Sequence, residues 1–151
     1  MGKHVTAAVT LTIALALAAA IAAPAATGPS TIRITDVQVR DRTVDLGPDG
    51  RGVGDVESLH VRLYNPSITQ KAIGRGDMLC TYLDSRLRTC DGTYSLPRGK
   101  LVVSGVISTR LLYVMAVVGG TGLYDNARGM LTVTATSFKP RHEILLFRLT
   151  G

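Results

Sequence analysis

Two short apolar runs that end in a glycine cluster constrain the fold of this chain most strongly. The runs Leu101–Ile107 and Leu111–Val118 are separated by three polar residues, and Gly119–Gly122 follows the second run. Each run is too short for an independent helix and is rich in valine and isoleucine, so both are predicted to be strands followed by a glycine turn. The next segment, Leu131–Thr136, alternates apolar and hydroxyl residues, which is typical of a half-buried strand.

Further strands are predicted on both sides of this stretch. Their ranges are Thr31–Val39, Glu57–Asn65, Met78–Leu83, Leu87–Tyr94 and Glu143–Leu149. Clusters of glycine and proline separate them, and the segment 71–77 is expected to be a glycine-broken loop. No stretch has the periodicity of an amphipathic helix, so the chain is predicted to be all-β, either a sandwich or a barrel.

The first 25 residues are predicted to be a signal peptide rather than part of the folded domain. Lys3 and His4 precede an apolar run from Val5 to Ala22, and small residues follow at a suitable cleavage site. The run is long enough to be a retained membrane anchor, but its alanine content makes it weakly hydrophobic. We therefore expect a secreted protein with no stable membrane insertion after cleavage, in which residues 26–151 form one domain.

The two cysteines, Cys80 and Cys90, agree with export. An even number of cysteines in a secreted chain predicts a disulfide, which here would join neighbouring strands. Two thiols without nearby histidines do not supply the four ligands of a zinc site, so no metal is expected.

Charge and histidine content exclude other classes of function. The formal net charge is +6, but the basic residues are scattered and do not alternate with stacking aromatic residues, which argues against nucleic-acid binding. The histidines, His4, His60 and His142, occupy no recognisable catalytic relay, so a nucleophilic triad is not expected.

The glycine-rich stretch resembles a known signature. The motifs G-K-L-V-V-S-G, A-V-V-G-G-T-G-L-Y and N-A-R-G, within Gly99–Gly129, resemble the allene oxide cyclase and dirigent-protein superfamily. The resemblance implies an eight-stranded antiparallel β-barrel with an apolar cavity, and a homotrimer. A phosphate-binding loop is disfavoured because a strand-like segment, not a helix, follows the glycines, and no cofactor is expected.

The first predicted strand offers a candidate catalytic acid. Strand alternation places Ile32, Ile34, Asp36 and Gln38 on one face. A carboxyl group among isoleucines has a raised pKa and becomes a general acid or base near neutral pH. The resemblance implies that Asp36 and Gln38 line the cavity. The alternative is that Asp36 pairs with a neighbouring arginine or is solvated near the strand end.

Tyr94 is the second candidate catalytic residue. The resemblance aligns it with a cavity tyrosine, whose phenol could donate a hydrogen bond to a ligand oxygen, although a half-buried tyrosine can also serve packing alone. The expected apolar wall consists of Leu59, Val61, Leu101 and Val103. Val61 aligns with a water-holding asparagine of the cyclases, which argues against allene oxide as the substrate.

Three functions agree with these patterns. The barrel could be a cyclase or isomerase of a small hydrophobic molecule, a dirigent-like protein that directs the stereochemistry of coupling, or a non-catalytic carrier or structural barrel. The runs 111–118 and 144–149 are apolar on both faces, so the outer face is expected to take part in self-association, a trimer by resemblance.

Overall fold

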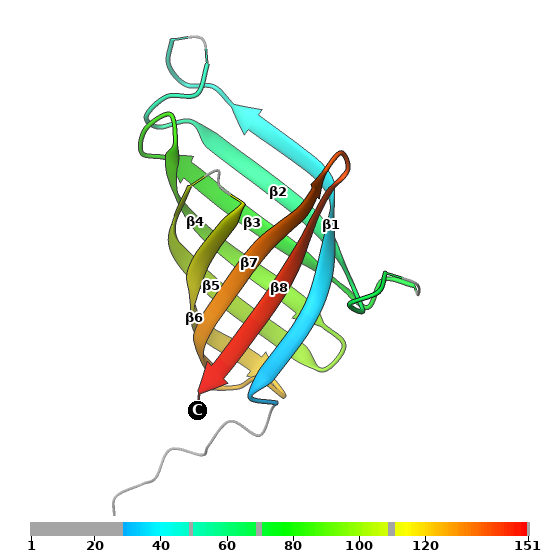
Figure 1. Ribbon diagram of the computed structural model, residues 1–151. Coiled ribbons are helices and arrows are strands. Elements are labelled where there is room, and N and C mark those ends of the chain that lie inside the picture. Colours follow the sequence, from blue (N-terminus) through cyan, green and yellow to red (C-terminus); the bar gives the residue numbers. More distant parts are fainter. Residues whose placement is uncertain (1–28, 49, 69–70, 109–110, 151) are drawn as a thin grey trace, which may run out of the picture.

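The chain folds into a closed barrel of eight antiparallel strands (Figure 1). This computed structural model describes residues 29–48, 50–68, 71–108 and 111–150. The strands are β1 (Thr31–Val44), β2 (Val56–Tyr64), β3 (Gly74–Tyr82), β4 (Leu87–Leu96), β5 (Gly99–Ser108), β6 (Leu112–Gly122), β7 (Arg128–Phe138) and β8 (Arg141–Thr150). Each strand pairs with the next and β8 pairs with β1, so the predicted all-β barrel is confirmed. The predicted signal peptide lies outside the described residues.

Two glycine-containing segments that were expected to be loops belong to strands. Strand β3 begins at Gly74, within the segment expected to be a loop, and β6 continues through Gly119–Gly122. At Gly120 an added Cβ would collide with the backbone oxygen of Tyr124, and at Gly74 with that of Ser95. These glycines therefore permit close approach of backbones within the barrel, and the turn itself follows them at residues 123–127.

The barrel interior divides into a packed half and a polar half. The packed half lies toward the end where β1 begins and β8 ends, which is the same end of the barrel (Figure 1). Its largest side chains are fully buried. They include Leu63, Leu101, Leu131, Leu145 and Phe147. Toward the opposite end, inward positions of the same strands carry buried charged residues instead: Asp36, Glu57, Arg88 and Glu143. Burial of several charged groups on one side of a core indicates a site rather than packing.

The predicted disulfide between Cys80 and Cys90 is present. The two residues lie directly opposite each other on β3 and β4, with a Cα–Cα distance of 4.1 Å, and both are fully buried. The bond therefore lies on the inner side of the barrel wall and joins the two strands next to the polar half.

Within the described ranges the chain forms no helix, so these ranges contain no helix long and apolar enough to cross a membrane.

Candidate active site

A cavity of about 220 Å³ occupies the polar half of the barrel. Strands β1 to β4 and β6 to β8 all contribute to its lining. The lining residues are Asp36, Gln38, Asp41, Arg51, Glu57, Leu59, Val61, Gly76, Met78, Arg88, Tyr94, Tyr113, Phe138, Arg141 and Glu143. A concave site with convergent ionisable groups is the usual form of a small-molecule site.

Two carboxyl groups face the cavity from neighbouring strands. Asp36 on β1 is directly opposite Glu143 on β8 in the strand register, and both are buried. Burial and, after it, the nearby negative charge of Glu143 raise the pKa of Asp36 to about 8. Asp36 is therefore mostly protonated at neutral pH and holds a proton that it can transfer.

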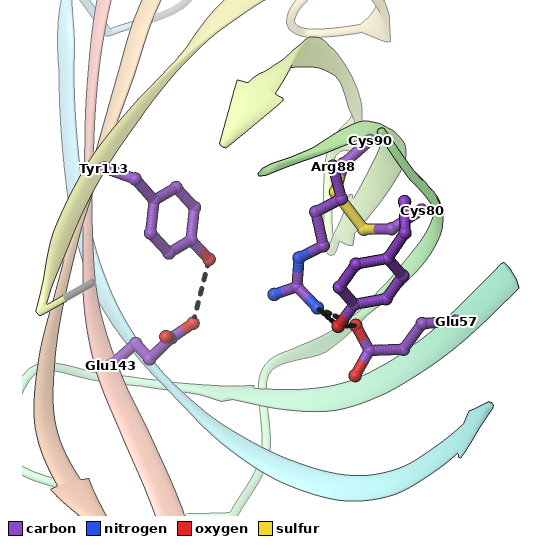
Figure 2. Close-up of a disulfide and its surroundings, with 7 residues drawn as sticks. Glu57, Cys80, Arg88, Cys90, Tyr113 and Glu143 are labelled. Atoms are coloured by element: carbon purple, nitrogen blue, oxygen red, sulfur yellow. Dashed lines mark hydrogen bonds and ion pairs between the residues drawn. A yellow bond between two sulfur atoms is a disulfide. The ribbon is translucent and has the colours of Figure 1, made fainter. Parts of the chain in front are cut away.

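Glu143 is held by an ion pair and a hydrogen bond. Arg141 donates to one carboxylate oxygen from Nε at 2.7 Å and from Nη2 at 2.5 Å. The Tyr113 hydroxyl donates to the other oxygen at 3.2 Å (Figure 2). The arginine thus forms its ion pair with Glu143, across the strand pair from Asp36. The pair therefore combines an acid whose pKa is raised, Asp36, with a carboxyl group that is ion-paired, Glu143, and two such environments can separate proton-donor and proton-acceptor roles.

Two tyrosine hydroxyls complete this wall of the cavity. Burial raises the pKa of both Tyr94 and Tyr113 well above the usual range, so both remain protonated hydrogen-bond donors. The ring of Tyr94 packs edge-on against Phe147 with 5.4 Å between ring centroids. Tyr94 therefore lies at the boundary between the packed half and the cavity.

The opposite wall carries a second buried polar cluster. Arg88 on β4 forms an ion pair with Glu57 on β2, and its Nη1 also donates to the Tyr82 hydroxyl at 3.2 Å. The Tyr82 hydroxyl in turn donates to Glu57 at 3.1 Å. Figure 2 shows Arg88 beside the disulfide, with its guanidinium projecting toward Tyr113 and Glu143 across the site.

The structure brings most of the sequence-predicted site residues to this one cavity. Asp36, Gln38, Tyr94, Leu59 and Val61 all line it. Whether they bind a ligand or act on it stays a prediction.

Leu101 and Val103 lie elsewhere. Both are fully buried members of the packed core and do not line the cavity. They pair with β4 residues, Leu101 with Tyr94 and Val103 with Gly92, but no residue of β5 belongs to the lining. Alternation correctly predicts which face of a strand points inward, but not which strands border the cavity.

The cavity was expected to be apolar, and this prediction is wrong because charged side chains line much of it. Sequence analysis did not identify these residues. Glu57, Arg88 and Glu143 each lie on the inner face of a strand that was predicted correctly. Extending the Leu59, Val61 alternation backward by one step places Glu57 inside, so the signal was present at the strand ends.

Among the described residues, no group of three or more histidine, cysteine, aspartate or glutamate side chains is arranged to hold a metal ion.

Comparison with known proteins identifies the fold. No family model and no curated protein sequence matches the chain. Among solved structures, one titled pyocyanin demethylase is 26% identical with a TM-score of 0.69, covering 80% of this chain and 99% of the other. The pterocarpan synthase dirigent protein GePTS1 is 18% identical with a TM-score of 0.62, covering 80% and 84%.

A third similar structure is the Diels-Alderase AbmU from Streptomyces koyangensis. It is 17% identical with a TM-score of 0.64, covering 79% of this chain and 64% of the other. Identities this low establish a shared fold, and the activities named in these titles are those of the other proteins. The chain has the barrel fold of the dirigent and cyclase proteins, which confirms the resemblance that its glycine motifs predicted.

Proposed function

We propose that this barrel binds a small molecule in its polar half and catalyses an isomerisation or cyclisation by proton transfer. The observation that carries the proposal is the buried pair of Asp36 and Glu143, one protonated and one ionised, on the wall of a ligand-sized cavity. Separation of two neighbouring carboxyl groups into an acid and a base is a common basis of acid–base catalysis. Solved structures with the same barrel that are titled as a cyclase, a Diels-Alderase, a dirigent protein and a demethylase support a cyclase-like or dirigent-like role.

The proposed reaction is a proton shift within one substrate molecule. The Glu143 carboxylate accepts a proton from a substrate carbon, and the electron pair of that bond moves into the conjugated system. Asp36 then donates its proton to a second substrate atom, and the proton on Glu143 returns to Asp36. Atoms and electrons balance without an external oxidant or reductant, and the Tyr94 and Tyr113 hydroxyls are available to orient the substrate.

The test is turnover by Asp36→Asn, which keeps the size of the side chain and removes the transferable proton. Wild-type protein and the variant are incubated with unsaturated ketones, polyenes and polyene epoxides in D₂O, and deuterium incorporation and product stereochemistry are measured. We expect wild type to convert at least one substrate, and the variant to be slower by about 100-fold or more. Asp91→Asn, at an exposed position of β4, is the matched control and should be as active as wild type.

Equal rates for wild type and Asp36→Asn would refute the proton-transfer role. Binding without any turnover by wild type would instead favour the carrier that the sequence left open.

The molecule is proposed to work in an oxidising compartment. The buried Cys80–Cys90 disulfide supports this, because such bonds persist in secreted and periplasmic proteins and are rare in the cytosol. Cell fractionation with N-terminal sequencing of the mature protein tests the proposal, which predicts an exported chain that lacks the first 25 residues.

A further inference from the structure

Arg88 has a hydrogen-bonding capacity that the described residues do not satisfy. It is 6% exposed, and its guanidinium group offers five N–H donors. The contacts with Glu57 and Tyr82 involve Nη1, while the buried Nε has no hydrogen-bond partner within the described ranges. A buried donor without an acceptor is costly, and in native proteins it usually has a reason.

The guanidinium group lies where a ligand would meet it. Arg88 lines the cavity, and Figure 2 shows the group extending from β4 toward Tyr113 and Glu143 on the opposite wall. A molecule held between the two walls would contact the arginine with one end and the carboxyl pair with the other.

The charge of the cavity favours a neutral acceptor over an anion. With Asp36 protonated, the lining carries the carboxylates of Asp41, Glu57 and Glu143 and the guanidinium groups of Arg51, Arg88 and Arg141, so the formal charges cancel. Glu57 already pairs with Arg88, so the lining offers no uncompensated positive charge to a ligand that enters as an anion.

The remaining lining favours a compact, flat molecule. Tyr94, Tyr113, Phe138 and Met78 supply aromatic and thioether surface, which packs well on a conjugated system. A volume of about 220 Å³ is below the usual range of drug-sized pockets, which starts at about 300 Å³.

We infer that Arg88 binds the carbonyl oxygen of a compact conjugated carbonyl compound, such as an aryl enone, and that this is the substrate class of the site. The inference rests on the proposed function for the chemistry at the Asp36 end of the molecule. Removal of a proton by Glu143 drives negative charge onto the carbonyl oxygen, and hydrogen bonds from a guanidinium strengthen as that charge develops. Arg88 thereby contributes both recognition of the substrate and stabilisation of its enolate form.

The experiment compares two ligands that differ in the oxygen alone. Benzalacetone is the enone probe, and its analogue with a methylene group in place of the carbonyl oxygen is the hydrocarbon control. Calorimetric titration should give wild type a preference of about 10- to 100-fold for benzalacetone, since hydrogen bonds to charged groups are the stronger ones. The infrared carbonyl stretch of the bound enone should also lie below its value in water.

The test variant is the double substitution Glu57→Gln/Arg88→Met, which leaves no unpaired buried charge. It should bind the two ligands about equally and lose the shift of the carbonyl stretch. Arg75→Met, at an exposed position on the outer face of β3, is the control and should retain both. Circular dichroism monitors folding, and Glu57→Gln alone, which keeps Arg88, should retain the preference for the enone if the double variant does not fold.

Three outcomes would overturn the inference: equal affinities of wild type for both ligands, binding of neither, or an enone preference that survives loss of Arg88. Equal affinities of wild type for the enone and the hydrocarbon would mean that water already satisfies the hydrogen-bond donors of Arg88. The last outcome would leave the proposed function intact, because the proton transfer is tested separately through Asp36→Asn.

Discussion

At the scale of single residues, the key feature is a carboxyl group that the fold keeps protonated. Asp36 is 2% exposed and lies directly opposite Glu143 in the pairing of β1 with β8. Burial raises the pKa of Asp36, and the negative charge of Glu143, which pairs with Arg141, adds to this effect. Burial of Asp36 costs more free energy when its carboxyl group is charged than when it is protonated.

This cost predicts how stability depends on pH. The pKa of Asp36 is about 8 in the folded chain and 3.8 without the fold, so between these values the folded state holds a proton that the unfolded state releases. The contribution of Asp36 is fully present below about pH 4 and is lost as pH rises to about 8.

We expect the free energy of unfolding of wild type, relative to Asp36→Asn, to fall by a few kcal/mol from about pH 4 to about pH 8. Urea unfolding of both proteins across this range measures the difference. A difference that is independent of pH would contradict the raised pKa.

The sequence predicted Asp36 but not its partner, for a physical reason. Two isoleucines before Asp36 identify the buried face locally, so strand alternation is sufficient. Glu143 lies more than a hundred positions later and meets Asp36 only because β8 closes on β1. Strand alternation carries no information about which distant strands become neighbours, and it gave no reason to connect these two acids.

At the scale of elements, the β3–β4 pair supports the cavity wall from which Arg88 projects. The Cys80–Cys90 disulfide joins the two strands, and Arg88 is two residues from Cys90 on the same face of β4. The position of the arginine therefore depends on a short, covalently closed hairpin.

Removal of the disulfide should lower stability. The variant Cys80→Ala/Cys90→Ala is expected to lose about 2 to 3 kcal/mol of unfolding free energy, because the open chain regains the entropy of a loop between residues ten apart. Urea unfolding of wild type and variant with and without reductant measures this loss. Equal stability of the two proteins under oxidising conditions would be the contrary result.

Gly76 on β3 tests whether the cavity requires its present shape. A Cβ at this position would lie 2.7 Å from Val61 and 2.9 Å from the ring of Tyr94, both of which line the cavity. Gly76→Ala should therefore displace Tyr94, lower stability by about 1 to 3 kcal/mol and weaken ligand binding. Thermal unfolding and titration with benzalacetone would measure the two effects.

Gly47→Ala is the matched control for this substitution, because an added Cβ there meets no atom within 4 Å. It should leave both stability and binding near the wild-type values. An equally small effect of Gly76→Ala would mean that Tyr94 is not fixed by β3.

Strand bounds were predicted less well than strand identity. The Gly119–Gly122 segment was read as a turn, since glycine is common in turns, but it lies within β6. Its lack of side chains serves a close approach to neighbouring backbone, a three-dimensional requirement that composition does not reveal.

At the scale of the whole molecule, apolar side chains are distributed unevenly, both in the interior of the barrel and on its outer face. One inner half is packed and the other holds the polar cavity, while the outer face of β6 exposes Leu112, Val114 and Val118, each by 44% or more. An exposed apolar stripe of this kind is unusual on a monomer and is typical of an association surface.

We therefore predict that the protein self-associates through the outer face of β6, as a trimer by resemblance. Light scattering should give a mass several times that of one chain for wild type and that of a single chain for Val114→Lys. Leu79→Lys, at an exposed position on the outer face of β3, should behave as wild type. A single-chain mass for wild type would contradict this prediction.

The most direct test of the central claim, an acid kept protonated inside a ligand-sized cavity, is an NMR titration of the isotope-labelled carboxyl carbon of Asp36. We predict a midpoint at about pH 8 that moves when benzalacetone binds. A midpoint near the ordinary value of 3.8, unaffected by the ligand, would contradict the account.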